Sequence, residues 1–492
     1  MIRAGLARTA PRYGAAGPPF GPRCTYPEMV SLLGPAYEES EPDPAYAGVR
    51  AALFGLGLDA ERFGTPDWNP LGELVAKGGR VALKPNFIRH FNPREDGGVD
   101  SVITHGSIVR AVADYAWLAV GREGRVEINE APQMDCQFDE VRRIAGLDEL
   151  IAFYGALDLE FRVVDLRREE VVFEDGIIVS RRALPGDPRG YRVVDLGERS
   201  FFADSGLDPD RLRGADYDAK PTGDHHRDGR NEYLLSESVL SADLVVNLPK
   251  LKTHKKTGVT LSLKNLVGIN GDKNWLPHHC VGSVDAGGDE FPGHSLVDRL
   301  RSLATEWARP LLARGWGLGL FRLARRVEDG ARGQDFIRSG NWHGNQTTWR
   351  MCLDLNRCFY YSDAKGLHLD APRPVRTALT LIDGIVAGED EGPLAPADRP
   401  LGAVLASCDP VAADLVALRL MGFDEARIPK IGRAMADEGP RVTAVRAPGD
   451  VAVGEVSAGT FDRVERSLDE IETEEPFVPH MGWRGAIERQ SA

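Results

Sequence analysis

The chain has 492 residues, of which 42% are hydrophobic and 27% charged, and its formal net charge is −14. Such a composition excludes a largely disordered chain, and the length allows two or three domains around a large buried core. The acidic balance excludes a nucleic-acid-binding role, because binding a phosphate backbone requires a dominant basic surface.

The six cysteines are scattered along the chain, and none of them has CxxC spacing. The sequence therefore predicts neither an iron–sulfur cluster nor a disulfide framework, and it favours a reducing, cytoplasmic location. No uncharged apolar run reaches the length of about 18 residues that a membrane-spanning helix needs. Residues 1–20 also contain no apolar signal-peptide core, so we expect no transmembrane segment.

The first part of the chain changes character near residue 80. Residues 1–40 are rich in Gly and Pro, and we predict an irregular extension there. The first strand is expected over residues 80–83, and it delivers Lys84 and Asn86 at its carboxyl end.

A helix is expected to begin at His105, which lies between Thr104 and Ser107 and precedes apolar residues at helical spacing. His105 either meets a ligand or bonds locally. The next strand is expected over residues 125–128, and it leads to Glu130. Strands that alternate with helices in this way predict a parallel sheet.

The region that follows keeps this mixed character. Residues 171–180 alternate between apolar and polar side chains, which predicts an antiparallel hairpin. Farther on, His225 and His226 lie in a loop rich in Gly and Asp. Two adjacent histidines in such a loop either ligate a metal or are simply exposed.

The stretch over residues 241–272 carries most of the chemistry. A short apolar strand over residues 244–247 is ended by Pro249, and a cluster of cations begins there. The cations are Lys250, Lys252, His254, Lys255, Lys256 and Lys264. Because Gly258 and several hydroxyl side chains interrupt them, the stretch predicts a loop that binds an anion. A solvated basic loop is the alternative.

Two further segments follow this stretch. Lys273 and the pair His278 and His279 either extend the site or lie in a surface loop. Residues 296–329 predict two amphipathic helices, broken at Pro310 and by the glycines that follow it. Such a segment is a lid, a dimer contact, a membrane contact or ordinary packing, and we expect a lid over the mouth of a cleft.

The last third returns to strands after a core helix that starts near residue 345. One buried strand is expected to end at Asp383, and the loop after it carries Glu389 and Glu391. Another strand ends before Asp409, which starts a helix. Carboxylates near a lysine-rich loop predict acid/base chemistry or a divalent cation held by oxygens, with a salt-bridge network as the alternative.

Several motifs together resemble the family called domain of unknown function 362. The motifs are Lys84-Pro85-Asn86, Thr104-His105, VVNLPKLKTHKKTGVTLSLKNLVG, IDGIVAGEDEGP and SCDPVAADLVA. The resemblance spans residues 80–435. Many members of that family carry a ferredoxin-like cysteine cluster, which this sequence lacks, so the resemblance implies no electron-transfer role here.

A second resemblance concerns His254, Gly258, Thr260 and Lys264. Their spacing is similar to the H-x3-G-x-S-x3-K stretch of the nickel-pincer lactate racemase family, with threonine in place of serine. In that family the lysine tethers the cofactor and the histidine lies in the active site. The resemblance implies an α/β scaffold with its active site in a cleft between two domains, and it does not imply nickel.

The sequence thus predicts an α/β fold with mostly parallel sheets, flanking helices, two lobes around a central cleft and an inserted helical segment. Polar residues after parallel strands should meet at one edge, so Lys84, Glu130, Lys250 and Asp409 are expected to converge. The expected parts are an irregular extension (1–40), a lobe with the Lys/His motif (41–295), a helical insertion (296–344), a second lobe (345–450) and an acidic tail (451–492).

We expect an enzyme that acts on a small carboxylate- or phosphate-bearing substrate, by racemase- or isomerase-like chemistry or by group transfer. A non-catalytic scaffold or protein that binds an anionic ligand is the alternative. A lysine near other ammonium groups and partly desolvated has a lowered pKa, so Lys264 is a candidate base or nucleophile with His254 as proton shuttle. The catalytic candidates are Lys264, His254, Lys84, Glu130 and Asp409.

The candidates for substrate binding are Asn86, His105, Lys250, Lys252, Thr260, Asn265 and Lys273. Asp383, Glu389 and Glu391 are candidates for acid/base work or for the oxygens around a metal. The sequence identifies no cofactor, and it leaves a divalent metal and a homo-oligomer open.

Overall fold

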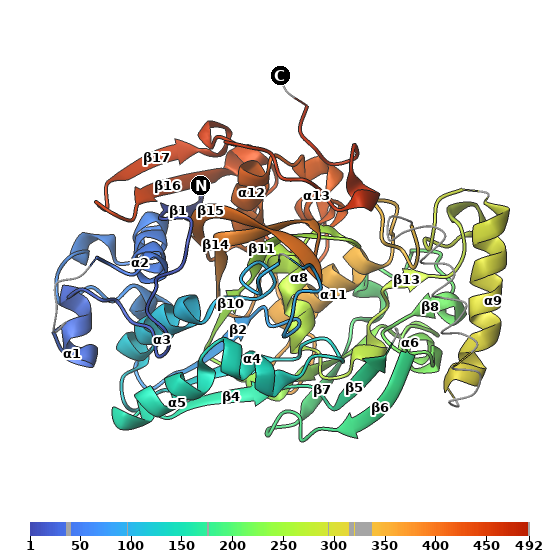
Figure 1. The fold of residues 1–492 in the computed structure, drawn as a ribbon, viewed down its shortest axis with the longest axis horizontal. Helices are drawn as coiled ribbons and strands as arrows, with labels where there is room; N and C mark the ends of the chain where they lie inside the picture. The colour runs from blue at the N-terminus through green and yellow to red at the C-terminus, as the bar shows by residue number, and fades with distance from the viewer. Residues whose placement is uncertain are drawn as a thin grey trace.

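The computed structural model describes residues 1–35, 41–95, 97–174, 177–293, 295–313, 319 and 337–490. At its centre lies an 11-stranded mixed, mostly parallel sheet with helices on both faces (Figure 1). The α/β class predicted from the sequence is therefore confirmed.

The strands of the large sheet come from both ends and from the middle of the chain. They are β1 (Ile2–Arg8), β2 (Arg80–Pro85), β3 (Arg125–Glu130), β4 (Phe161–Asp165), β10 (Leu244–Leu248), β11 (Lys250–His254), β12 (Gly258–Val259), β14 (Ala378–Glu391), β15 (Ala395–Ser407), β16 (Val451–Ser457) and β17 (Arg463–Ser467). Their order is β17-β16-β1-β15-β14-β10-β2-β3-β4, and β11 pairs with β12 and with the later part of β14.

Three two-stranded sheets accompany the large one. They are β5 (Glu169–Glu174) with β6 (Ile177–Ala183), β7 (Tyr191–Asp195) with β9 (Glu232–Ser236), and β8 (Leu212–Arg213) with β13 (His279–Cys280). The pair β5–β6 is antiparallel, which confirms the predicted hairpin.

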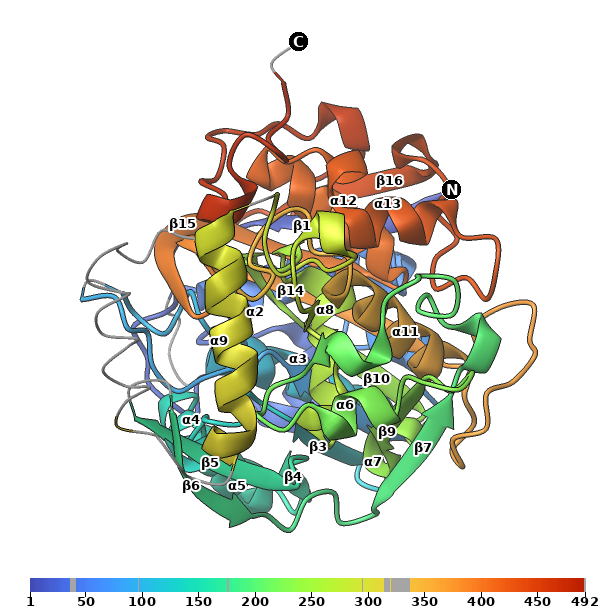
Figure 2. The same cartoon turned by 90° about the vertical axis from the view of Figure 1, so that its right-hand side faces the viewer.

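Helices cover the two faces of the large sheet and its surroundings. The helices α2 (Pro44–Leu56), α3 (Gly106–Val120), α4 (Phe138–Ile144) and α5 (Leu147–Ala156) contribute to one hydrophobic core, and α8 (Leu261–Asn265), α11 (Thr348–Tyr361), α12 (Pro410–Met421) and α13 (Pro429–Ala436) to the other. The remaining helices are α1 (Val30–Leu33), α6 (Lys220–Asp224), α7 (Glu237–Leu240) and α9 (Leu296–Ala313). Helix α9 stands at the end of the molecule opposite to α1 (Figure 1), and Figure 2 shows it from the front.

The central strand β10 shows why the sheet is buried on both faces. Successive side chains of a strand point to opposite faces. Leu244 and Val246 therefore enter the core beneath α3, and Val245 enters the core beneath α8. A nearly continuous apolar run is typical of such a parallel strand, because helices cover both of its faces.

Local signals fix the ends of two long helices. Asp43 and Asp409 are the N-caps of α2 and α12, and each carboxylate accepts hydrogen bonds from two backbone N–H groups. A proline follows each cap, and Gly57 and Gly422 end the helices with φ of 93° and 75°. Aspartate before the first turn and glycine after the last are the residues that these positions favour.

Both ends of the chain contribute strands to the large sheet: residues 2–8 are a strand within the expected irregular extension (1–40), and β16 and β17 lie within the expected acidic tail (451–492). Strand β1 pairs in parallel with β16 and in antiparallel orientation with β15. Its residues Ala4, Leu6 and Ala7 are fully buried. The high Gly and Pro content of the whole segment concealed this short alternating strand.

The two ranges that we expected to form separate lobes share one sheet. Val245 of β10 lies beside Ala378 of β14 in parallel register. The sheet therefore passes from one range into the other, and the division into two lobes stays a prediction.

The helical insertion differs from its prediction in one respect. Helix α9 continues through Pro310 to Ala313, so the predicted break at Pro310 is wrong. Glu306 and Arg309, just before Pro310, bind Arg213 and the carbonyl oxygen of Asp216 in the body of the protein. Tertiary contacts of this kind override the low helix propensity of proline. Residues 314–318 and 320–336 lie outside the described residues. Among the helices that the structure describes, none is both long and apolar enough to span a bilayer.

Candidate functional site

A cavity of about 400 Å³ lies at the carboxyl ends of β2, β3 and β11. Its wall brings together seven of the predicted site residues, which are Asn86, Glu130, His254, Thr260, Lys264, Asn265 and Lys273. Lys255, Lys256, His278 and His279 also line it. Residues that lie far apart in the sequence thus meet at one edge of the sheet, where ligands bind in open α/β folds.

A buried ion pair supports the floor of the cavity. The Nζ atom of Lys84 donates to Glu130 Oε2 at 2.8 Å and to the carbonyl oxygen of Pro85 at 2.7 Å. Glu130 Oε2 also accepts from the backbone N–H of Phe87 at 3.0 Å. Burial lowers the pKa of Lys84, and its pairing with Glu130 opposes that effect. Each charge of this pair therefore has a partner of opposite charge and further hydrogen bonds inside the protein.

Gly268 passes directly over this pair. A Cβ atom at this position would lie 2.1 Å from Glu130 Oε1 and 2.5 Å from Lys84 Nζ. A side chain there would displace the pair, so the close approach of the backbone requires glycine.

Helix α8 presents Lys264 to the cavity, and its first turn is held from outside. Leu261 has a φ of 50°, an unusual value for a bulky residue. Asp414 accepts from the backbone N–H of Ser262 at 2.7 Å, and Lys430 donates to the carbonyl oxygens of Val259 and Thr260 at 2.6 Å each. Two buried charged side chains thus maintain a conformation that the local sequence does not favour.

Lys264 is buried, with only 8% of its surface exposed. Its ammonium group has no hydrogen bond and no ion pair with any residue that the structure describes. Burial lowers the pKa of Lys264. Desolvation was one of the two causes that we expected. The other was neighbouring ammonium groups, but the charges that act on Lys264 are those of Cys352 and Glu130, and both raise its pKa.

Other polar groups of the cavity also lack partners. The buried atoms Asn86 Oδ1, Thr260 Oγ1 and His279 Nδ1 have no hydrogen bond to any residue that the structure describes. Asn86 is nevertheless held in place, because its amide donates to Asn265 Oδ1 at 2.9 Å. An unpaired buried polar group costs free energy unless a ligand or water satisfies it.

Three more lysines add positive charge to the wall. Burial lowers the pKa of Lys255 to about 8 and that of Lys256 and Lys273 to about 7. Lys256 donates to the carbonyl oxygen of Ser339, and Lys273 donates to that of Val267 at 3.1 Å. The cations thus collect on one wall of a strongly acidic protein.

The histidines of the wall are neutral, and their hydrogen bonds define where the proton lies. His254 Nδ1 accepts from the backbone N–H of Lys256 at 3.0 Å, so its proton is on Nε2. Burial holds the pKa of His254 well below its ordinary value. His278 Nδ1 lies 2.8 Å from the carbonyl oxygen of Leu276 and therefore carries the proton, and burial lowers its pKa to about 3. His254 thus offers a donor and His278 an acceptor.

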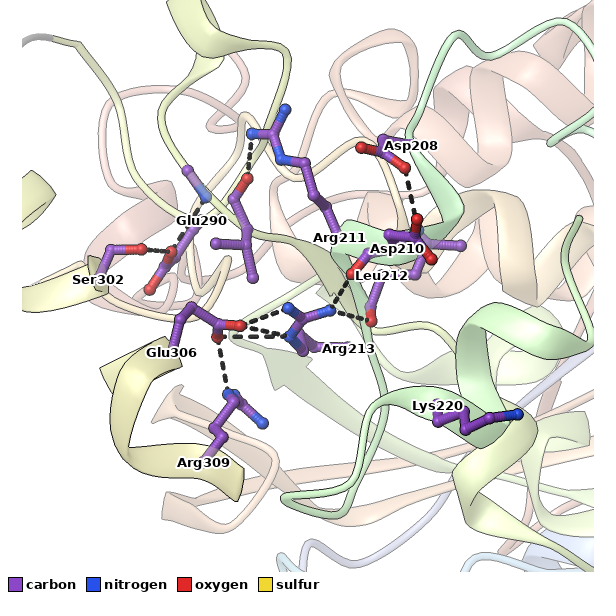
Figure 3. A network of polar contacts seen from close by, with 12 residues as sticks. Asp208, Asp210, Arg211, Leu212, Arg213, Lys220, Glu290, Ser302, Glu306 and Arg309 are labelled. Atoms are coloured by element: carbon purple, nitrogen blue, oxygen red, sulfur yellow. Dashed lines mark hydrogen bonds and ion pairs between the residues drawn. The ribbon is translucent and has the colours of Figure 1, made fainter. Parts of the chain in front are cut away.

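Helix α9 completes the cavity on one side, where Arg309 is part of the wall. Glu306 lies between Arg213 and Arg309 and binds both, and Ser302 donates to Glu290 at 2.7 Å (Figure 3). The opposite side of α9 is apolar and exposed, with Trp307 at 82%. Arg309 of the predicted lid segment thus lines the cavity, and closure of the segment over the mouth stays a prediction.

The comparisons with known proteins concern the part of the chain that supplies most of the cations. Residues 192–419 match the family model described as domain of unknown function (DUF362). These residues carry a DUF362 domain. The match is shorter than residues 80–435, over which the motifs suggested the resemblance. Asn86, Glu130 and Phe173 precede the match, so the cavity lies between the DUF362 domain and the preceding part of the chain.

One curated relative is the thylakoid-associated protein sll1697 of Synechocystis sp.. It is 24% identical over 236 residues, which cover 48% of this chain and 52% of the relative. The chain thus spans about half the length of the relative that it matches. No solved structure is significantly similar to this chain.

Lys250 of the DUF362 domain lies away from the cavity, in a second buried cluster. Its Nζ donates to Asp383 Oδ2 at 2.9 Å and to the hydroxyl of Tyr13 at 2.5 Å. Asp383 also accepts from the backbone N–H of His105 at 3.0 Å, and the rings of Tyr13 and His105 are stacked at 3.8 Å. Lys252 is likewise absent from the cavity wall, and it donates to the carbonyl oxygen of Val102.

This separation follows from strand geometry. Asp383 points to the same face of the sheet as Leu381, which belongs to the core beneath α3. Lys84 points to the same face as Ala82, which belongs to the core beneath α8. Lys84 and Lys250 thus lie at the same edge of the sheet, as expected, but their side chains point to opposite faces, so they do not converge on one cavity.

Asp409 does not converge with the other residues at all, which corrects the prediction for this carboxylate. Strand β15 is antiparallel to β14, with Ser407 beside Thr380 near the start of β14. The end of β15 therefore lies at the opposite edge of the sheet. There Asp409 caps α12 and accepts a hydrogen bond from Thr443 at 2.7 Å.

The predicted loop carboxylates are parts of a long strand. Strand β14 does not end at Asp383 but continues to Glu391, and a tight turn connects it to β15. Glu389 accepts from the backbone N–H of Val478, and Glu391 lies 3.0 Å from His480 Nε2. Both carboxylates therefore bind the C-terminal segment, as in the salt-bridge alternative. The Lys/His run at residues 250–254 is also a strand rather than a loop, because it pairs with the continued part of β14.

The candidate metal positions show other contacts. His225 Nδ1 lies 2.7 Å from Glu232, and the ring of His225 stacks on Trp275. His226 is buried and bonds to Asn231 and to the carbonyl oxygen of Trp275. In the described part of the chain, no group of three or more His, Cys, Asp or Glu side chains could hold a metal ion.

Asp414 and Lys430 are the residues that sequence reasoning missed. Both are fully buried, and burial raises the pKa of Asp414 to about 6 and lowers that of Lys430 to about 8. The signal for Asp414 is a single charge within the otherwise apolar stretch VAADLVAL. Such a charge is expected to have a specific buried partner, although the sequence does not identify the partner.

Proposed function

We propose that the protein is an enzyme that binds a small carboxylate- or phosphate-bearing substrate in this cavity and transfers a proton with Lys264. The observation that carries the proposal is the buried ammonium of Lys264, which has no partner in the described protein. An ammonium group in such a largely buried place needs an anion or water from the cavity as its partner, or it loses its proton. Both states serve a substrate anion, the first in binding and the second in acid/base catalysis.

The roles of the neighbouring groups follow from their protonation. The Nε2–H of neutral His254 would donate to a substrate oxygen on which negative charge develops. Lys264, with its lowered pKa, would take a proton from the substrate as the neutral amine. Lys273 would neutralise the substrate anion, and the Lys84–Glu130 pair would keep the floor of the cavity in place.

The resemblance of His254, Gly258, Thr260 and Lys264 to the lactate racemase motif supports the roles proposed for Lys264 and His254. It carries no cofactor from that family. The alternative is a non-catalytic protein that binds an anionic ligand, and the experiment below separates the two. A cytoplasmic location and a homo-oligomeric state stay predictions, and the relative's name connects only that relative with thylakoids.

The first test is equilibrium binding of acetate and inorganic phosphate to the parent protein and to Lys264→Met. Methionine keeps a long unbranched side chain and removes the charge. We expect affinity to fall at least tenfold for both anions. Lys365→Met is the matched control, because Lys365 is exposed and is not part of the cavity wall. Equal affinities of the parent and Lys264→Met would refute the proposed role of the lysine.

The second test measures catalysis without knowledge of the natural substrate. A panel of carboxylic acids is incubated with the protein in D2O, and exchange of carbon-bound hydrogen is followed by mass spectrometry. Exchange that is lost in Lys264→Met supports the enzyme. Binding without exchange across the panel would favour the non-catalytic alternative. Intact-mass and metal analysis of the purified protein would show whether Lys264 carries a covalent group.

A further inference from the structure

The cavity is much larger than the anion that its cations would hold. A volume of about 400 Å³ corresponds to the liquid volume of about thirteen water molecules, at ~30 Å³ for each. Acetate or inorganic phosphate would fill a small part of this space. The rest of the ligand must therefore match the remaining walls.

Much of the remaining wall is apolar, although Gln133, Asp216, Arg309 and Ser339 also line the cavity. The apolar part comes from Ile88, Met134, Phe173, Tyr217 and Leu394, which we call the apolar wall. Met134 is buried, and the other four are partly exposed. Apolar side chains that remain partly exposed around a cavity gain free energy when an apolar ligand covers them.

The members of the apolar wall lie together through short backbone connections. The backbone N–H of Gln133 donates to the carbonyl oxygen of Ile88 at 3.2 Å, and that of Val171 donates to Met134 at 2.9 Å. The hydroxyl of Tyr217 accepts from the backbone N–H of Ile178 in β6. The hairpin β5–β6 therefore carries Phe173 beside Met134 and Tyr217.

The cations come from other segments of the chain. We call Lys255, Lys256, Lys264 and Lys273 the cationic wall; they follow β11, lie on α8 or follow α8. Its member Lys264 is buried, with 8% of its surface exposed. The cavity thus combines largely buried lysines with partly exposed apolar side chains.

We infer that the ligand of this cavity is an amphipathic oxyanion: a carboxylate or phosphate group on an apolar body that is larger than a few carbon atoms. The inference rests on the proposed function for the anionic end and adds the apolar end. The anion would pair with Lys264 and its neighbours, and the aliphatic or aromatic body would cover Phe173, Met134 and Leu394. A ligand of this kind fills the volume that a small inorganic anion leaves empty.

The test is isothermal titration of the full-length protein with two matched series. One series is acetate, butanoate, hexanoate and phenylacetate, and the other is inorganic phosphate and phenyl phosphate. We expect affinity to rise along each series, by roughly tenfold to a hundredfold from acetate to phenylacetate. Hexanamide, which keeps the body and lacks the charge, should bind at least tenfold more weakly than hexanoate.

Variants of the apolar wall test the apolar end of the ligand separately from its anionic end. Phe173→Ala and Leu394→Ala should each lower the ratio of hexanoate affinity to acetate affinity at least threefold. The affinity for acetate itself should stay within twofold of that of the parent. Phe91→Ala is the matched control, since Phe91 is exposed and is not part of the wall. Circular dichroism checks that each variant is folded, and Leu394→Ala keeps the test valid if loss of Phe173 disturbs the hairpin.

The outcomes separate this inference from the proposed function. Acetate binding that depends on Lys264, with no gain along either series, would overturn the amphipathic ligand and leave the proposed function standing. A gain that Phe173→Ala and Leu394→Ala do not reduce would also overturn it. If no member of either series binds, or if binding does not depend on Lys264, both proposals fail.

Discussion

Lys250 and Lys264 lie in one motif, and both are buried, but their surroundings are opposite. Lys250 is fully enclosed and bonds to Asp383 and Tyr13. Lys264 faces the cavity and has no partner among the described residues. The first lysine completes a charge pair inside the protein, and the second leaves its charge available to a ligand.

The difference shows what a cluster of cations in a sequence conveys. The motif identifies a segment where charge is concentrated, but strand geometry decides which lysine faces which carboxylate. Asp383 follows the face of β14 that lies beneath α3, so it neutralises Lys250 and cannot reach Lys264. Lys264 is therefore our candidate because it lacks a partner among the described residues, more than because of its place in the motif.

The contrast between the two lysines is tested most directly at Lys250. Lys250→Met leaves Asp383 buried without its partner, and we expect the free energy of unfolding to fall by about 3–5 kcal/mol. Chemical denaturation of the parent and the variant measures this difference. The double variant Lys250→Met, Asp383→Leu should recover part of the loss, because no charge is then left unpaired. A single variant as stable as the parent would show that the pair is not needed for the fold.

Gly268 tests the other buried pair, beneath the cavity. In Gly268→Ala the new Cβ would lie 2.1 Å from Glu130 and 2.5 Å from Lys84, so the pair must move. We expect a loss of about 1–3 kcal/mol in the free energy of unfolding, together with weaker anion binding. Gly155→Ala is the control, since its Cβ would meet open space on α5, and it should stabilise the protein by about 0.5–1 kcal/mol. Equal effects of the two substitutions would contradict the close approach at Gly268.

Lys264→Met provides the counterpart of the Lys250 experiment. Because it removes a buried ammonium that has no partner, we expect the free energy of unfolding to change by less than about 1 kcal/mol, and to rise rather than fall. Chemical denaturation under the same conditions measures it. A loss as large as that of Lys250→Met would mean that Lys264 has a structural partner, and the contrast between the two lysines would fail.

The sequence predicted the elements that depend on local signals. Strands β2, β3 and β10 lie where apolar runs indicated them, and the hairpin over residues 171–180 follows its alternating pattern. His105 is the N-cap of α3, and its ring accepts from the backbone N–H of Ser107. Here the residues that determine an element lie within it.

The errors concern relations between distant segments. Because β15 is antiparallel to β14, Asp409 lies at the edge opposite to the one that we predicted. Nothing in residues 402–409 indicates the direction of β15. The pairing of β11 with the continued part of β14 turned a predicted loop into a strand. Asp414 reaches α8 because α12 packs against it, and Lys430 of α13 bonds to the two residues that precede α8. Such contacts are decided by the whole fold, so local sequence patterns do not reveal them.

The cationic wall makes a prediction about pH that further separates it from the paired lysines. Burial lowers the pKa of Lys255 to about 8 and that of Lys256 and Lys273 to about 7, whereas an unfolded lysine keeps its proton to about pH 10.4. In that interval the unfolded chain binds more protons than the folded one. These three groups should therefore make the free protein more stable as pH rises from about 7 to about 10.

Anion binding should change in the opposite direction, because only the ammonium form attracts an anion. We expect the affinity for phenylacetate, whose charge is constant in this range, to fall as pH rises from about 6 to about 9. Titration calorimetry at a series of pH values measures the slope, and Lys273→Met should make it shallower. In Lys365→Met, where an exposed lysine is removed, the slope should equal that of the parent. An affinity that is independent of pH would show that these lysines keep a constant charge, and the cationic wall would then differ from Lys250 only in its partners.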